Sequence, residues 1–147
     1  MATSQLKTMS EKKLEITIPR KIVQNLLHHA QQTPEQEVCG LISSLNNIPC
    51  RCFPIENTAD QPESFFNLDP QQQIQAMAEM RENNEQLFAI YHSHPSAPAI
   101  PSSTDIEQAN YPDALYIIIS LNTKGILELR AYQLANAQFT EVPLRLY

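Results

Sequence analysis

The nine residues 87–95 read Leu-Phe-Ala-Ile-Tyr-His-Ser-His-Pro and join an apolar run to a pair of histidines. An apolar run of this length is typical of a central strand that is covered on both faces of its sheet. Residues 114–121 form a second run of the same kind. We therefore expect both runs to form central strands, with the histidines at the end of the first.

Around these two runs the chain alternates strand-like and helix-like segments and repeats no unit, which predicts an α/β (α+β mixed) fold with helices flanking a mixed sheet. The expected strands are 14–18, 38–43, 50–55, 126–134 (after a hairpin turn at 122–125) and 139–147, with 50–55 and 139–147 near sheet edges because they contain Pro54 and Pro143. The expected helices are 19 to just before Pro34, 70–84 after an Asp69 N-cap, and 103–109, and a loop covers 57–67. The first helix should bury Ile22, Val23, Leu26, Leu27 and Ala30, and the second Ile74, Met77 and Ala78.

The composition excludes several classes of protein. The 147 residues suit one domain, expected over 14–147 after a flexible polar tail at 1–13. Two glycines leave no phosphate-binding loop or dinucleotide fingerprint, and a net charge of -6 argues against nucleic acid as a partner. Three cysteines (Cys39, Cys50 and Cys52) without a C-x-x-C pair favour a reduced, cytoplasmic setting. The polar start and the lack of an apolar run of about 18 residues lead us to expect neither a signal peptide nor a membrane span, and nothing in the sequence indicates an oligomeric state.

His92 and His94 are candidates for a metal site, because alternation along an extended chain puts both on one side. Asp105, in the first turn of the expected 103–109 helix, could complete a two-histidine, one-carboxylate zinc site with an open position for water. Two other interpretations stay open: the histidines are only hydrogen-bonding groups at a strand end, and Asp105 is a helix-capping acid. Cys39 is a competing ligand or a small core residue.

Three zinc patterns do not fit this chain: the H-E-x-x-H helix, the deaminase H-x-E with P-C-x-x-C, and the amidohydrolase barrel of about 250 residues. A fourth pattern fits, because Glu37, His92-Ser93-His94, seven residues, and Ser102-Ser103-Thr104-Asp105 together resemble the JAMM (MPN+) metalloprotease signature. Segments 37–40, 56–59 and 66–70 also resemble that family, and the resemblance spans about 14–134. The short connection 106–113 after Asp105 resembles the compact stand-alone bacterial members. The resemblance implies their three-layer, cytidine-deaminase-like fold.

The resemblance also implies roles for individual residues. His92, His94 and Asp105 would bind one zinc ion per chain, whose bound water, with its pKa lowered to about 7, is the nucleophile. Glu37 would be the general base, and Ser102 would donate a hydrogen bond to the oxyanion, a role compatible with capping the 103–109 helix. Ser93 points the other way and has a supporting role. Pro95, Pro98 and Pro101 are expected to stiffen the loop between the histidines and Ser102.

The expected activity is that of a zinc peptidase or isopeptidase. It would hydrolyse the bond after the C-terminal Gly-Gly of a ubiquitin-like or sulphur-carrier protein and release cysteine or another adduct. The alternatives are a non-catalytic scaffold of the same fold that binds ubiquitin-like proteins, and a metallohydrolase acting on small amides. Scaffold members usually lack the metal ligands, whereas this chain retains all of them.

Overall fold

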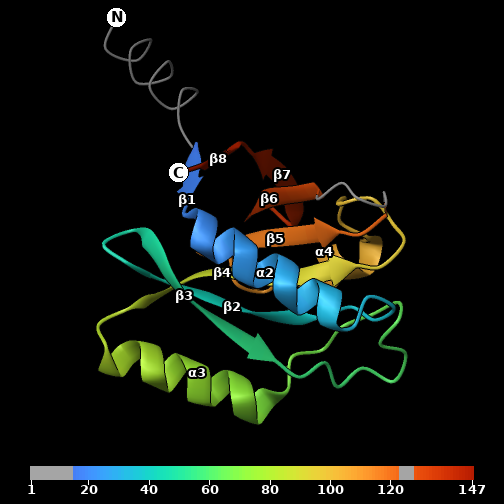
Figure 1. Cartoon of the computed structure of the whole chain (residues 1–147), viewed down its shortest axis with the longest axis horizontal. Coiled ribbons are helices and arrows are strands. Elements are labelled where there is room, and N and C mark those ends of the chain that lie inside the picture. The colour runs from blue at the N-terminus through green and yellow to red at the C-terminus, as the bar shows by residue number, and fades with distance from the viewer. Residues whose placement is uncertain (1–14, 123–127) are drawn as a thin grey trace, which may run out of the picture.

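The computed structural model describes residues 15–122 and 128–147 (Figure 1). Six strands form one sheet in the order β3-β2-β4-β5-β6-β7, and β1 and β8 form a separate parallel pair. The described strands are β1 (Ile16–Ile18), β2 (Cys39–Leu45), β3 (Ile48–Ile55), β4 (Gln86–His94), β5 (Leu115–Ser120), β6 (Glu128–Ala135), β7 (Gln138–Val142) and β8 (Leu144–Leu146). The described helices are α2 (Arg20–Gln32), α3 (Pro70–Glu82) and α4 (Ser103–Gln108).

The two apolar runs form the middle of the six-stranded sheet, as the sequence predicts. They are β4 and β5, which lie side by side and pair in parallel from Ala89 opposite Leu115 to His94 opposite Ser120. Helix α2 covers one face of the sheet and α3 the other, so the molecule has three layers (Figure 1). The expected mixed α/β, three-layer fold is confirmed.

Alternation along β4 decides which face each side chain joins. Ala89 and Tyr91 belong to the core under α2, and Ile90 belongs to the core under α3. Because side chains alternate with a period of two, His92 and His94 follow Ile90 on the α3 face. Both histidines lie within β4 rather than beyond it, and both are buried.

The prediction that Ile74 turns inward is wrong, because its side chain is 68% exposed. The buried residues of α3 are Ala76 and Met80, with Met77 packed beside them. Residues 76, 77 and 80 follow the i, i+1, i+4 spacing of one helix face, and Ile74 lies outside that stripe.

The expected final strand 139–147 is two strands, which is a second correction. Pro143 has no N–H to donate and ends β7 at Val142, whose partner in β6 is Ala131. The carbonyl of Pro143 accepts a hydrogen bond from the Ile16 N–H at 2.9 Å, and the chain continues as β8 beside β1. The edge positions expected for 50–55 and for the β7 part are confirmed, since β3 and β7 end the sheet.

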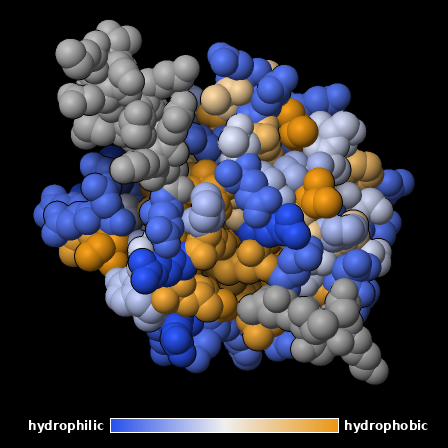
Figure 2. Space-filling view, turned by 90° about the horizontal axis from the view of Figure 1, so that it is seen from above, coloured by the Kyte–Doolittle hydropathy of each residue, from blue (hydrophilic) through white to orange (hydrophobic). Residues whose placement is uncertain are grey.

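Two expectations lie outside the described residues: the tail 1–13, and most of the turn 122–125 with the first residues of the strand expected at 126. Within the described chain no helix has the length and hydropathy needed to cross a membrane. On the surface, apolar side chains gather near the middle of one face and polar ones surround them (Figure 2).

Gly40 lies opposite Tyr91 in the antiparallel pair of β2 and β4 and close to the Tyr91 ring. A Cβ atom at this position would lie 2.5 Å from both the Phe53 carbonyl oxygen and the Tyr91 hydroxyl oxygen. Tyr91 cannot retreat easily, because it is fully buried and its hydroxyl makes a 2.7 Å hydrogen bond with His29 Nδ1. We expect Gly40→Ala to lower the free energy of unfolding by about 1–3 kcal/mol, the usual cost of overpacking a core. Urea denaturation measures this change, and an unaltered midpoint would contradict it.

Candidate active site

Strand pairing brings Glu37 beside the two histidines. In the antiparallel β2·β4 pair Cys39 lies opposite His92, and the Ser93 N–H continues the pairing by donating to the Val38 carbonyl at 3.0 Å. Extending this register by two residues puts Glu37 opposite His94. Opposite residues of an antiparallel pair present their side chains to the same face a few ångströms apart. The site is therefore built where β2 begins and β4 ends.

Asp105 reaches the same point from α4. Ser102 is the N-cap of this helix: its Oγ accepts a hydrogen bond from the Asp105 N–H at 3.0 Å, and Asp105 Oδ2 accepts one from the Ser102 N–H at 2.9 Å. This reciprocal capping box fixes the Asp105 side chain. The capping interpretation of Ser102 is thus realised, while its hydroxyl hydrogen stays available to donate elsewhere.

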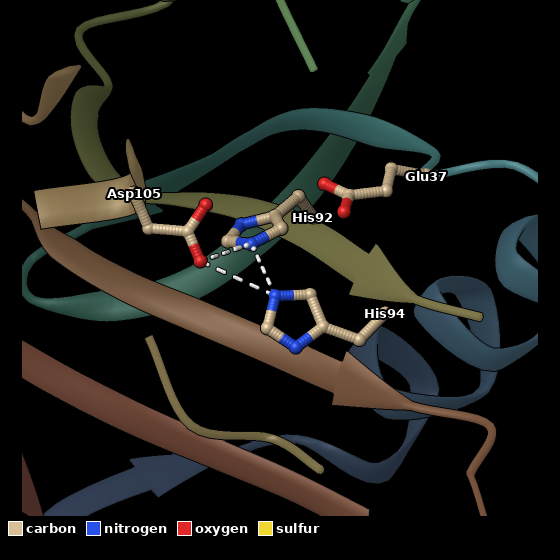
Figure 3. Close-up of side chains that lie close together, drawn as sticks. All are labelled: Glu37, His92, His94 and Asp105. Carbon is tan, nitrogen blue, oxygen red and sulfur yellow. Dashed lines mark hydrogen bonds and ion pairs between the residues drawn. The ribbon is translucent and has the colours of Figure 1, made fainter. Parts of the chain in front are cut away.

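The four side chains converge on one point (Figure 3). His92 Nε2 and His94 Nε2 are 3.1 Å apart, and each lies 3.2 Å from Asp105 Oδ2. One potential ligand atom from each of Glu37, His92, His94 and Asp105 lies within 4.8 Å of all the others. The structure thus brings together four of the five residues expected to bind metal or act in catalysis, and Ser102 lies at the start of the helix that carries Asp105.

The three closest donor atoms fit a bound zinc ion. Zinc with tetrahedral ligands at about 2.0–2.1 Å needs donors about 3.3 Å apart, close to the triangle seen here. His94 Nδ1 donates to the Pro98 carbonyl at 2.7 Å, which leaves Nε2 as the ring nitrogen that faces the site, the arrangement usual for a metal-bound histidine. Within the described chain, Glu37 Oε1 and His92 Nδ1 are buried without a hydrogen-bond partner.

Charge at the site favours a cation. Burial alone would raise the pKa of Asp105, but hydrogen bonds with His92 and His94 outweigh it and hold this pKa far below its usual range. Burial lowers the pKa of His92, whereas for His94 the Asp105 carboxylate and the Pro98 carbonyl overcome burial and raise the pKa. Burial raises the pKa of Glu37 to about 7. The site thus holds an ionised carboxylate beside two imidazoles, with a proton-accepting group next to them.

Cys39 does not join this cluster. Its thiol donates to the Ile55 carbonyl at 3.4 Å, and burial raises its pKa to about 12. The cluster of converging ligand atoms in the described chain consists of Glu37, His92, His94 and Asp105, without Cys39. Among the described residues Cys39 is therefore a core residue, the second of its two interpretations.

Two contacts at the site could not be found from the spacing of residues. The Phe66 ring stacks on His92 with 4.3 Å between the ring centroids, and the Pro98 carbonyl orients His94. Ser93 has the supporting place expected for it, because its Oγ accepts a hydrogen bond from the Val38 N–H at 2.9 Å. The sequence shows Phe66 next to the start of α3, but its contact with His92 depends on how the 57–67 loop folds back.

A pocket of about 540 Å³ opens beside His92 and Asp105. Its walls include the rings of Phe66, Tyr111, Tyr116 and Phe139, and the side chains of Asn67, Gln73, Glu107, Gln108 and Asn110. Neither lysine nor arginine is among the described residues that line it. The pocket can therefore hold a partly apolar chain next to the four converging side chains.

The loop 95–101 is held at both sides by hydrogen bonds. Its carbonyls accept from His94 Nδ1, from Ser120 Oγ at 2.6 Å and from the Tyr132 hydroxyl at 2.6 Å. This loop determines where His94 and Ser102 lie relative to each other, and its three prolines restrict the backbone torsions available to it.

We expect replacement of Pro95, Pro98 and Pro101 together by alanine to lower zinc affinity or turnover by about tenfold, the effect of losing support behind a ligand. Titration against a chromogenic chelator and steady-state kinetics measure the two quantities. Pro112→Ala, on the exposed connection after α4, is the matched control. Unchanged values of both quantities in the triple variant would refute the prediction.

Comparison with known proteins agrees with this geometry. The family model for prokaryotic homologues of the JAB domain matches residues 19–134. The CysO-cysteine peptidase of Mycobacterium tuberculosis is 31% identical over 131 residues, 88% of this chain and 89% of that protein. The solution structure of protein DSY2949 from Desulfitobacterium hafniense is 30% identical, with a TM-score of 0.80 over 89% of this chain and 92% of that one.

A JAB1/MPN domain protein from Archaeoglobus fulgidus shares the fold at 16% identity, with a TM-score of 0.57 over 92% of this chain and 98% of that one. The JAMM/MPN resemblance of the sequence is thus confirmed by the family model, by a peptidase relative along most of the chain, and by the fold. The chain is a hydrolase that belongs to the stand-alone prokaryotic JAB branch of the JAMM/MPN family.

Proposed function

We propose that this protein is a zinc-dependent peptidase that hydrolyses the bond after the C-terminal Gly-Gly of a ubiquitin-like or sulphur-carrier protein. One observation carries the proposal: His92, His94 and Asp105 present three donor atoms 3.1–3.2 Å apart, and the Glu37 carboxylate faces them without a partner of its own for Oε1. A non-catalytic scaffold needs neither the donors nor the buried acid.

His92, His94 and Asp105 would hold the zinc ion. When bound, zinc acts as a Lewis acid that polarises a carbonyl group and lowers the pKa of water. Glu37 accepts the proton of the attacking water, and the proposal assigns to the same carboxylate its return to the nitrogen of the departing amine. A pKa near 7 suits both transfers, because the group can be deprotonated and protonated at neutral pH.

Ser102 serves the reaction from the N-cap of α4, beside Asp105. Its Oγ is engaged as an acceptor by the Asp105 N–H, which fixes the hydroxyl at the start of α4. The hydroxyl hydrogen can then donate to the oxygen that becomes negatively charged when the carbonyl is attacked. The helix cap and the oxyanion contact are compatible roles of one side chain.

The surroundings of the site support a narrow, flexible substrate. A Gly-Gly tail has no side chains, so its backbone can approach buried groups such as His92, and the adjoining pocket offers aromatic and amide walls to the preceding residues. The connection 109–114 between α4 and β5 is short and contains no further helix or strand, so it leaves no room for the insertion with which polyubiquitin-cleaving members of the family recognise a second ubiquitin. This suits a single carrier as the substrate. The relative named CysO-cysteine peptidase supports cysteine as the released group.

The test is a cleavage assay on a purified sulphur-carrier protein whose C-terminal Gly-Gly bears one added cysteine. We expect the zinc-loaded protein to remove the cysteine and a chelator to stop the reaction. A second carrier joined through Gly-Gly to a lysine side chain tests isopeptide cleavage. Binding of either carrier without cleavage would instead support the scaffold alternative, and cleavage of small amides alone would support the small-amide hydrolase.

A further inference from the structure

The loop 57–67 between β3 and α3 lies against the active site at two points. The Pro62 carbonyl accepts a hydrogen bond from the Glu37 N–H at 2.7 Å, and the Phe66 ring stacks on His92. The two ends of the loop pair with each other. Asn57 forms an antiparallel β-bridge with Leu68, and the Thr58 N–H donates to the Asn67 carbonyl at 2.9 Å. The loop is thus a closed unit that touches both the expected base and a metal-binding histidine.

One side chain holds this unit together and joins it to Glu37. Asn57 Nδ2 donates to the Glu37 carbonyl at 2.8 Å and to the Phe65 carbonyl at 2.9 Å. Asn57 Oδ1 accepts from the N–H groups of Ala59 and Asn67, both at 3.0 Å. A carboxamide has two donor hydrogens and an oxygen with two lone pairs, so Asn57 uses its whole hydrogen-bonding capacity here.

Glu37 depends on such support because it precedes β2, which begins at Cys39. Its carbonyl is held by Asn57, its N–H by Pro62, and the next residue, Val38, donates to Ser93 Oγ. Glu37 Oε1 has no partner among the described residues, so the carboxylate is positioned through its backbone. The same carboxamide also hydrogen-bonds the backbone of Phe65 and Asn67, the two neighbours of Phe66, whose ring stacks on His92.

We infer that Asn57 is a positioning residue of the reaction, which fixes the Glu37 backbone relative to the ring that covers His92. The inference rests on the proposed function, in which Glu37 transfers the proton and His92 holds the metal. Proton transfer is sensitive to small displacements, and a misplacement of about 1 Å can cost about a hundredfold in rate. Loss of Asn57 should therefore lower kcat more than KM or metal content.

Two variants separate the contacts. Asn57→Ala removes all four hydrogen bonds. Asn57→Asp keeps the oxygen that accepts from Ala59 and Asn67, but replaces the two donors with an oxygen facing the Glu37 and Phe65 carbonyls. Asn83→Ala is the matched control, since Asn83 Nδ2 donates to the Glu79 carbonyl at 2.9 Å at the end of α3 and contacts neither Glu37 nor His92.

We expect both Asn57 variants to lose about a hundredfold in kcat on the Gly-Gly carrier, with zinc content and KM little changed. The Asn83→Ala variant should keep the wild-type kcat. In metal-free protein, hydrogen exchange of the Glu37, Ala59 and Asn67 amides should be about tenfold faster in Asn57→Ala, with amides of α2 unchanged.

The inference is overturned if these three amides exchange at the wild-type rate in Asn57→Ala, or if kcat is unchanged or falls no further than in Asn83→Ala. Hydrogen exchange in metal-free protein requires no substrate, so it tests the positioning contact even where the wild-type protein fails to cleave the carrier. Failure of the wild-type protein to cleave the carrier would count against the proposed function but not against the inference about Asn57.

Discussion

Replacing Glu37 with glutamine is expected to abolish most turnover while the protein keeps its zinc. Glutamine has nearly the same shape, but its amide cannot accept the proton of the attacking water or return it to the leaving amine. General acid–base catalysis contributes about 10²–10⁴-fold, so kcat should fall by a factor in that range. Metal analysis of the purified variant should still give one zinc ion per chain, because His92, His94 and Asp105 remain.

The stability of the metal-free Glu37→Gln variant provides an internal check. Burial raises the pKa of Glu37 from 4.5 to about 7, so the folded protein favours the protonated acid more strongly than the unfolded chain does. Ionised Glu37 therefore reduces stability progressively as the pH rises from about 4.5 to about 7. A neutral glutamine avoids this effect, and the variant should melt no lower than wild type at neutral pH.

Glu35→Gln is the matched control, because Glu35 lies two residues earlier and is exposed. It should keep the wild-type kcat. Wild-type turnover in Glu37→Gln with a normal zinc content would contradict the assignment of Glu37 as the base. Loss of zinc in Glu37→Gln would instead show that Glu37 is needed to hold the metal.

Replacing Asp105 with asparagine is expected to release the metal and, with it, the activity. Asparagine keeps the shape and one oxygen for the Ser102 N–H, but it removes the negative charge that His92 and His94 face at 3.2 Å. Because support behind a ligand alone is worth about 10–100-fold in affinity, loss of the charged ligand should cost at least about a hundredfold. Competition titration with a zinc chelator measures this change.

Asp113→Asn is the control for the Asp105 variant, since Asp113 is an exposed acid on the connection after α4. It should bind zinc as wild type does. The account predicts that Asp105→Asn purifies without zinc and remains inactive after zinc is added at the concentration that saturates wild type. Full zinc occupancy with wild-type turnover in Asp105→Asn would contradict the ligand assignment.

Much of the fold was predictable because it depends on short-range patterns. The runs 87–91 and 114–121 indicate buried strands by composition alone, and Asp69 followed by Pro70 indicates the start of α3 through its N-cap geometry. The period of two along β4 also places His92 and His94 on one face without further information. These features follow from local chemistry, and the structure contains all of them.

The remainder depends on contacts between distant segments. Ile74 is apolar but exposed, because the packing of α3 on the sheet selects Ala76 and Met80 instead. Pro143 ends β7 for a local reason, but the pairing of β8 with β1 forms only when the two ends of the described chain come together. Local sequence gives no means of foreseeing either contact.

The candidate site also has a part that local sequence predicts and a part that depends on contacts between distant segments. The proximity of Asp105 to His94 could be predicted from their spacing in the sequence, because α4, which carries Asp105, follows His94 after a proline-rich loop. Glu37, taken alone, is an ordinary acid, and the residues by themselves do not bring it to the histidines. The β2·β4 register does so, and only the resemblance to the JAMM signature made Glu37 a candidate beforehand. The contacts of Phe66 with His92 and of Pro98 with His94 come from loops and carry no sequence signal of their own.

The most direct test of the central claim is mass spectrometry of a sulphur carrier ending in Gly-Gly-cysteine after incubation with this protein. The protein is used zinc-loaded, stripped of metal by a chelator, and stripped and then resupplied with zinc. The account predicts that the carrier loses one cysteine residue in the first and third samples and stays intact in the second. Equal cleavage by the stripped protein, or an intact carrier in all three samples, would contradict it.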